Sequence, residues 1–142
     1  MYRQVETSFM LPEKFEFPNG GKLSEDNRWV IMAKLIPWFE FEEEYASYFS
    51  EDIGAPAKSF RMALGALIIK EKLGTSDRET VEQIRENPYL QYFLGLEAFT
   101  NEAPFDSSMF VHFREKIGVD LVNKVNKQMG NEYIYIKGSP YR

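Results

Sequence analysis

One segment of the sequence is apolar around almost its whole circumference. From about Ala57 to Leu73 it reads AKSFRMALGALIIKEKL, in which apolar side chains occupy most faces of a helix. A helix that is apolar on most sides has to be surrounded by other elements. The segment therefore predicts a central buried helix around which the rest of the chain packs.

Amphipathic patterns on both sides of this segment indicate further short helices, because apolar residues recur at the period of a helix. Polar caps mark two of the starts: Ser24 or Asp26 before the first helix, and Asp106 or Ser107 before a later one. The expected ranges are 24–36, 37–50, 76–86, 87–95, 106–117 and 119–129. Together with the central helix they predict an all-α fold, a compact bundle of six or seven short helices.

The two ends of the chain lack a helical period. Residues 1–23 contain the turn sequence PNGGK and place Phe15 and Phe17 on one side of an extended strand. They predict an extended N-terminal arm that lies over the bundle. We expect residues 24–130 to form the helical domain and residues 131–142 to form a strand or a tail.

The sequence KEKLGTSDRETVEQI carries the signals of one helix end and the next helix start. Gly74 stands where a left-handed C-terminal cap belongs. Ser76 followed three residues later by Glu79 has the spacing of a capping box. Val81 and Ile84 supply the apolar face of the second helix. The pattern predicts a helix-turn-helix-like element.

Two interpretations of this element remain open on local grounds: a corner of the core, or a DNA reader. Aligned on its glycine with repressor-type motifs, the element has Thr80 and Gln83 where apolar residues are expected. It also has Lys70 where a small residue is preferred. These departures favour the corner.

The charge distribution bears on the DNA interpretation. The net charge is −5, and phosphate contacts need Lys and Arg. Residues 1–55 hold 5 basic and 11 acidic residues, whereas residues 56–90 hold 6 basic and 5 acidic ones. The acidic excess therefore belongs to the N-terminal third, and the later helices are close to balanced.

Basic side chains in the later helices are the candidates for contact with double-stranded DNA. They group on polar faces near the predicted turn, where they could reach the groove or the phosphates. The candidates are Lys58, Arg61 and Lys72 on the central helix, Arg78 and Arg85 on the next, and His112, Arg114 and Lys116 as a second basic site.

The sequence gives little support for catalysis, metal binding or nucleotide binding. The chain has no cysteine and a single histidine, His112, without a nucleophile at a motif spacing. The acidic group at 40–44 is typical of a solvated helix face rather than a cation site. No glycine pattern for phosphate binding occurs. We expect no catalytic residue, metal, cofactor or small-molecule substrate, and, because the longest apolar run is too short for a membrane span, a cytoplasmic protein.

Three blocks together resemble the N-terminal domain of InsH-like bacterial insertion-sequence transposases. They are DNRWVIMAKLIPWFEFEEEYASYFS, PAKSFRMALGALIIKEKLGTSDRETVEQIRENPYLQYFLGL and PFDSSMFVHFREKIG, and they cover roughly residues 26–118. In that family a helical domain precedes an RNase H-like catalytic domain with an Asp-Asp-Glu metal triad.

The resemblance implies a domain that binds the element's terminal inverted repeats and assembles the transposase on DNA. No residue here matches the triad, so the resemblance implies no enzyme activity for this chain, and it offers residues 131–142 as the entry to a missing catalytic domain. The alternative is a protein-interaction module, used for dimerisation or for docking on the catalytic domain, whose surface includes the acidic helix 37–50.

Overall fold

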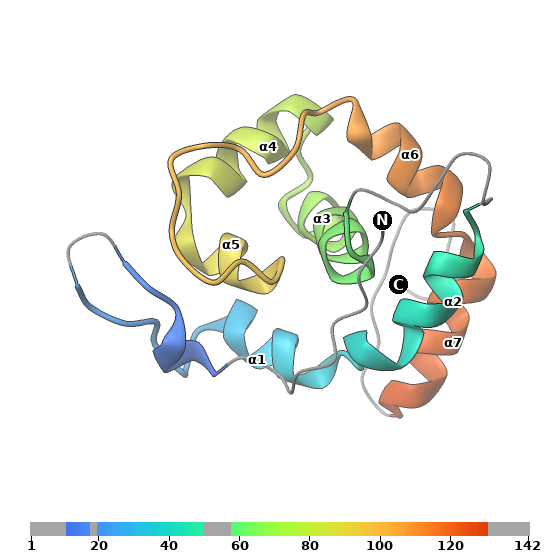
Figure 1. The fold of residues 1–142 in the computed structure, drawn as a ribbon, viewed down its shortest axis with the longest axis horizontal. Helices are drawn as coiled ribbons and strands as arrows, with labels where there is room; N and C mark the ends of the chain where they lie inside the picture. The colour runs from blue at the N-terminus through green and yellow to red at the C-terminus, as the bar shows by residue number, and fades with distance from the viewer. Residues whose placement is uncertain (1–10, 18–19, 50–57, 131–142) are drawn as a thin grey trace.

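The computed structural model describes residues 11–17, 20–49 and 58–130 (Figure 1). Within these residues the chain forms helices, and its one β feature is an isolated parallel bridge between Glu16 and Ala98. The elements are η1 (Pro12–Lys14), α1 (Arg28–Leu35), η2 (Trp38–Phe41), α2 (Glu42–Ser47), α3 (Phe60–Leu73), α4 (Asp77–Glu86), α5 (Pro88–Phe93), α6 (Met109–Lys116) and α7 (Val119–Met129), where η marks a 3-10 helix. The predicted all-α fold is confirmed.

The central element is α3, as its nearly continuous apolar pattern predicted. Figure 1 shows it close to end-on, with the other helices arranged around it. It packs against η2, α2, α4 and α6. Phe60 and every residue from Ala63 to Ile69 are buried, so the core of the molecule is built on this helix.

The segment at the end of α5 approaches α3 closely at a glycine. A Cβ atom at Gly65 would lie 2.9 Å from Cδ2 of Leu94 and 3.5 Å from Cδ2 of Phe93. On its other side the Phe93 ring meets the rings of Trp29 and Trp38 edge-on, with centroids 5.2 and 5.3 Å apart. Because Gly65 has no side chain, Phe93 and Leu94 can pack directly against α3. The Phe93 ring then connects the central helix to α1 and η2.

The described part of the N-terminal arm is joined to the segment that follows α5. The Phe15 side chain is buried in the core. The Glu16 N–H donates to the Glu97 carbonyl at 3.0 Å, and the Phe99 N–H donates to the Glu16 carbonyl at 2.8 Å. The described part of the arm thus packs on the bundle, although it contains the 3-10 turn η1 and is not extended throughout. The remainder of it, residues 1–10 and 18–19, and the expected tail 131–142 lie outside the described residues.

The first helix begins later than predicted. Its first residue is Arg28, and the cap is the side chain of Asn27, which accepts from the Trp29 N–H at 2.8 Å. The Asp26 N–H donates to the Ser24 hydroxyl at 3.3 Å, and the Asn27 N–H donates to the Ser24 carbonyl at 3.2 Å. The residues predicted as caps therefore form a turn ahead of the helix.

The stretch predicted as one helix over 37–50 contains two elements, η2 and α2. A 3-10 turn has three residues per turn, so it rotates the faces relative to a continuous α-helix. Tyr48 is 37 % exposed, while Glu42, from the acidic group expected on a solvated face, is only 2 % exposed. The Glu42 carboxylate accepts from the Phe60 N–H at 3.4 Å, at the start of α3.

The helix predicted from 106 begins at Met109. The carbonyl of Asp106 accepts from the Met109 N–H at 2.9 Å, and its carboxylate accepts from the Ser108 N–H at 2.9 Å. Asp106 therefore starts a turn that leads into α6 rather than capping the helix itself.

Candidate nucleic-acid interface

The turn between α3 and α4 is held by caps on both sides. Gly74 ends α3 with a φ of 66°, and its N–H donates to the Lys70 carbonyl at 2.9 Å. The Ser76 hydroxyl accepts from the Glu79 N–H at 3.1 Å and caps α4. The carboxylate of Glu79 accepts from the Gln83 side chain at 2.8 Å. The predicted caps Gly74 and Ser76 are confirmed, whereas the Glu79 carboxylate bonds Gln83 rather than completing the predicted capping box.

Two residues that departed from the repressor-type pattern stabilise this corner. Thr80 is buried, and its hydroxyl donates to the Ser76 carbonyl and lies 2.7 Å from the Thr75 hydroxyl. The Lys70 ammonium donates to the Thr75 carbonyl at 2.7 Å and lies 3.6 Å from the Asp77 carboxylate. Both polar side chains are thus satisfied within the turn.

An ion pair joins α6 to the first turn of α4. Both terminal nitrogens of Arg114 donate to the two carboxylate oxygens of Asp77, each at 3.1 Å. The hydrogen-bonded Arg114 guanidinium lowers the pKa of Asp77, Lys70 adds to this effect, and the pair in turn raises the pKa of Arg114. The end of α3, the start of α4 and the outer face of α6 therefore form one edge of the molecule, here called the α3–α4–α6 edge.

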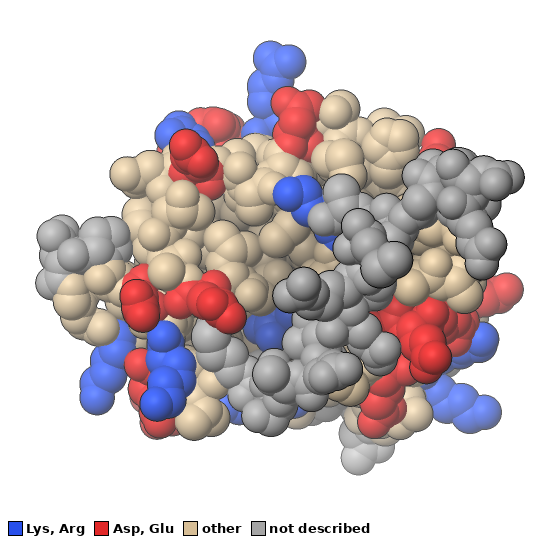
Figure 2. Space-filling view, in the orientation of Figure 1, with Lys and Arg blue, Asp and Glu red and all other residues tan. Residues whose placement is uncertain are grey.

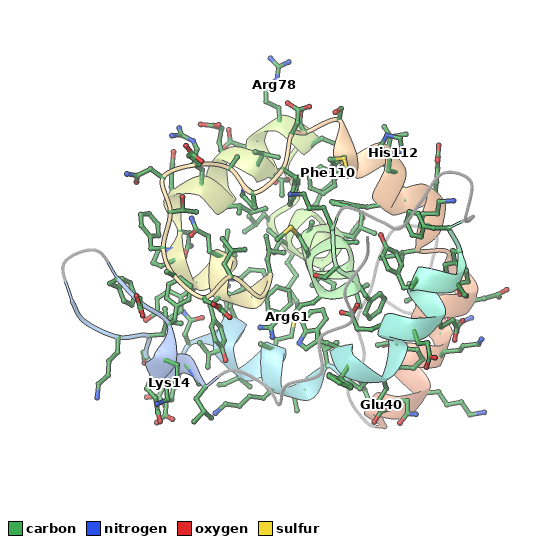
Figure 3. All side chains as sticks on the ribbon, in the orientation of Figure 1. Lys14, Glu40, Arg61, Arg78, Phe110 and His112 are labelled. Atoms are coloured by element: carbon green, nitrogen blue, oxygen red, sulfur yellow. The ribbon has the colours of Figure 1, made fainter. Side chains whose placement is uncertain are left out.

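Three of the eight sequence candidates are exposed on this edge and form no ion pair within the described part of the chain: Lys72, Arg78 and His112. Lys72 lies in the last turn of α3 and Arg78 in the first turn of α4. Figure 3 shows Arg78 projecting outward from α4, with His112 on the neighbouring α6. The fold brings these three side chains, from three helices, to one edge.

Acidic groups limit the extent of the cationic surface. Arg78 borders, with Glu82 and Asp106, a hollow of about 590 Å³ between α4 and the loop that precedes α6. Arg85 donates to the Glu82 carboxylate at 2.7 Å. Figure 2 shows blue and red side chains interspersed along this edge, without a continuous basic stripe. Lys72 and Arg78 lie near the corner, but acidic residues occur along the whole of α4, with Asp77 and Glu79 in its first turn and Glu82 and Glu86 further on.

Arg61 is held inside the fold. Its Nε donates to the Phe93 carbonyl at 2.9 Å and its Nη2 to the Tyr92 carbonyl at 2.7 Å, which satisfies the last turn of α5. The guanidinium also lies over the ring of Trp38, 5.2 Å from its centroid. Burial lowers the pKa of Arg61 to about 10, so it stays charged at neutral pH. The Arg61 guanidinium therefore connects α3 to α5 and η2 within the fold.

Two further candidates have their ammonium groups bonded within the chain. Lys58 donates to the Pro104 carbonyl at 2.7 Å and fastens the loop before α6. Lys116 donates to the Tyr48 carbonyl at 3.2 Å and lies 4.9 Å from the centroid of the Phe49 ring. Lys116 thus connects α6 to the end of α2, on a different side of α6 from Arg114.

Sequence reasoning missed the residues that hold the α3–α4–α6 edge together, Asp77 and Lys70. An acidic residue directly after a cap is common because it complements the helix dipole. That signal identifies Asp77 as part of a helix start. Its partner Arg114 lies 37 residues away in the sequence, and only the fold brings them together.

Other classes of site receive no support from the described residues. No group of three or more His, Asp or Glu side chains among them is arranged to hold a metal ion. Within the same residues, no helix has the length and apolar character that crossing a bilayer requires.

Comparison with known proteins identifies the family. Residues 19–116 match the model of the family described as "Transposase domain (DUF772)". A relative from Rhizobium meliloti, named "Uncharacterized protein ORF8 in nfe locus", is 39 % identical over 89 residues, which cover 63 % of this chain and 42 % of the relative. The chain thus aligns with less than half of that relative's length. No solved structure gives a significant match.

The family match covers the helices from α1 to α6, including the helix-turn-helix-like corner and the Asp77–Arg114 pair that joins it to α6. It agrees with the resemblance carried by the three sequence blocks. This chain belongs to the DUF772 transposase-domain family.

Proposed function

We propose that this domain binds the terminal inverted repeats of an insertion sequence on behalf of a transposase, and that it does so with the α3–α4–α6 edge. The observation that supports the proposal is Arg78, which projects from the first turn of α4 with no ion pair among the described residues. Lys72 and His112 flank it from α3 and α6. In a transposase-family domain, DNA is the partner that the two cations and the neighbouring imidazole fit.

The charges favour contact through the corner over a helix that lies along the groove. In α4, the acidic residues Asp77, Glu79, Glu82 and Glu86 outnumber Arg78 and Arg85. A helix with this balance is repelled by phosphates on both sides of a groove. Lys72 and Arg78, on either side of the turn, can each meet a phosphate of one strand, and the Asp77 carboxylate beside them is already paired with Arg114. We therefore propose a contact dominated by phosphates.

Arg85 belongs to the outer part of this contact. Its guanidinium is exposed, but it already binds the Glu82 carboxylate, and that pair has to open before a phosphate can be bound. Arg114 acts indirectly, since it holds Asp77 and so orients the start of α4. We leave Lys58, Arg61 and Lys116 out of the DNA-contacting set because their bonds are made inside the fold.

We assign no catalytic residue to this domain. The family model covers a transposase-family domain, and none of the described acidic residues forms a metal site. In the proposal, strand cleavage and transfer belong to a catalytic domain elsewhere in the transposase.

The test is binding of the full chain to a duplex with the terminal repeats that flank its gene, followed by fluorescence anisotropy. A scrambled duplex measures non-specific affinity. We expect Lys72→Ala plus Arg78→Ala to weaken binding about tenfold or more, since two phosphate contacts are lost. Lys22→Ala plus Lys127→Ala removes the same charge from exposed positions on other elements. An equal loss in both double variants would contradict the proposal, because only overall charge would then matter.

A further inference from the structure

The corner between α1 and η2 presents an unusual pattern of exposure on both sides of Pro37. Ile36 and Trp38, next to this proline, are buried. One step further out, Leu35 and Phe39 are large apolar residues, and each is 44 % exposed. The chain bends here because Pro37 cannot continue α1, and the bend leaves both side chains outside the core.

Charged residues extend the pattern by one position on each side. Lys34 precedes Leu35 and Glu40 follows Phe39, and both are exposed. Neither forms an ion pair with another described residue. Figure 3 places Glu40 at the same edge of the molecule as α1. Going away from Pro37, the chain therefore carries an apolar and then a basic residue on the α1 side, and an apolar and then an acidic residue on the η2 side.

We propose that a second copy of this chain covers the corner, in a two-fold symmetric dimer whose axis passes near Pro37. A two-fold interface brings the same patch together from both subunits, so a residue on one side of the axis meets the residue from the other side of the partner's patch, and each such contact occurs twice. Leu35 of each copy then packs on Phe39 of the other, and Lys34 of each faces Glu40 of the other. The order of the four residues makes the patch complementary to itself.

The surrounding surface agrees with this arrangement. α1 carries Arg28 and Lys34 and no acidic residue, whereas η2 and α2 expose Glu40 and Glu43. Ile31, one turn before Leu35, is also exposed and lengthens the apolar strip. If α1 of one copy lay along α1 of the other in the same direction, the basic residues of the two copies would face each other. The two-fold arrangement instead places the basic helix of one copy against the acidic elements of the other.

The patch has only a few exposed side chains on each subunit, whereas a standard interface has about 20–30 residues on each side, so we expect association that depends on protein concentration. Sedimentation of the full chain without DNA measures it. The wild type is expected to shift from monomer to dimer as concentration rises. Leu35→Gln and Phe39→Gln should each keep the chain monomeric over that range. Val111→Gln is the matched control, since Val111 is 49 % exposed on α6, and it should dimerise as the wild type does.

Charge reversal tests the predicted pairing across the axis. Lys34→Glu alone and Glu40→Lys alone should each weaken the dimer, because each sets like charges together. The two substitutions in one chain should restore it. A wild-type chain that stays monomeric at every concentration, a dimer lost equally with Val111→Gln, or a double reversal no better than the single ones would overturn the proposal. DNA is absent throughout, so these outcomes are independent of the proposed DNA contact.

Discussion

Two arginines on successive helices, Arg61 and Arg78, have opposite roles in this molecule. Arg61 lies at the interior side of α3, bonded to two carbonyls of α5 and stacked on an indole ring. Arg78 projects from the corner at the other end of α3. The same side chain stabilises the fold in the first region and is available to a partner in the second. A basic stripe on a helix therefore does not define a DNA-binding face until the bonds of each cation are known.

The largest effect that separates the two regions is expected from Arg61→Ala. The substitution leaves the Tyr92 and Phe93 carbonyls without these bonds and should lower the free energy of unfolding by about 2–5 kcal/mol. Arg61→Lys should recover only part of the loss, because an ammonium cannot reproduce the planar two-nitrogen contact. Urea denaturation measures both. Arg85→Ala, at an exposed ion pair, is the control and should change stability by less than about 1 kcal/mol. If Arg61→Ala and Arg85→Ala lowered the free energy of unfolding by similar amounts, the structural role assigned to Arg61 would be wrong.

A smaller effect is expected at the corner itself. Gly74 has a φ of 66° and open space where a Cβ would lie, so Gly74→Ala adds backbone strain without a clash. We expect a loss of about 1 kcal/mol. Gly118, with a φ of −94° and equally open space, is the control without left-handed strain; it is the N-cap of α7, so Gly118→Ala should cost a little stability, but less than Gly74→Ala. If thermal unfolding shows the same change for both, the left-handed cap does not hold the corner.

The smallest effect concerns Glu42, in the interior region beside Arg61. Burial raises the pKa of Glu42 above its ordinary 4.5. The stability that this group contributes is then fully present below about pH 4.5 and is lost as the pH rises through its folded pKa. Glu42→Gln is nearly isosteric, so we expect the difference in unfolding free energy, wild type minus variant, to fall as the pH rises. Denaturation at several pH values measures it, and a difference that does not change with pH would be inconsistent with a buried carboxyl.

Elements fixed by local sequence were predictable. The apolar circumference of α3, the glycine that ends it and the serine that caps α4 all act within a few residues, and the structure has each of them. The break at η2 was not predicted, and it is accompanied by a contact that is distant in sequence: the Glu42 carboxylate accepts from the Phe60 N–H, 18 residues later. The late start of α1 likewise follows from a turn at Ser24, where competing cap residues stand side by side.

The candidate site was less predictable than the fold. Lys58, Arg61 and Lys72 were predicted together on the central helix, but the partners of the first two lie 46 and more than 30 residues away. A pattern read along one helix carries no information about those partners. Lys72 stays exposed because nothing in the described chain packs against the last turn of α3 at that position.

The salt dependence of DNA binding tests the central claim most directly, because it counts the phosphates that the protein neutralises. The logarithm of the binding constant falls linearly with the logarithm of salt concentration, by about 0.9 per phosphate contact. We predict that Lys72→Ala plus Arg78→Ala lowers this slope by about 2 on the terminal-repeat duplex. The slope of Lys22→Ala plus Lys127→Ala should equal that of the wild type. An unchanged slope in the corner variant would contradict the assignment of DNA binding to the α3–α4–α6 edge.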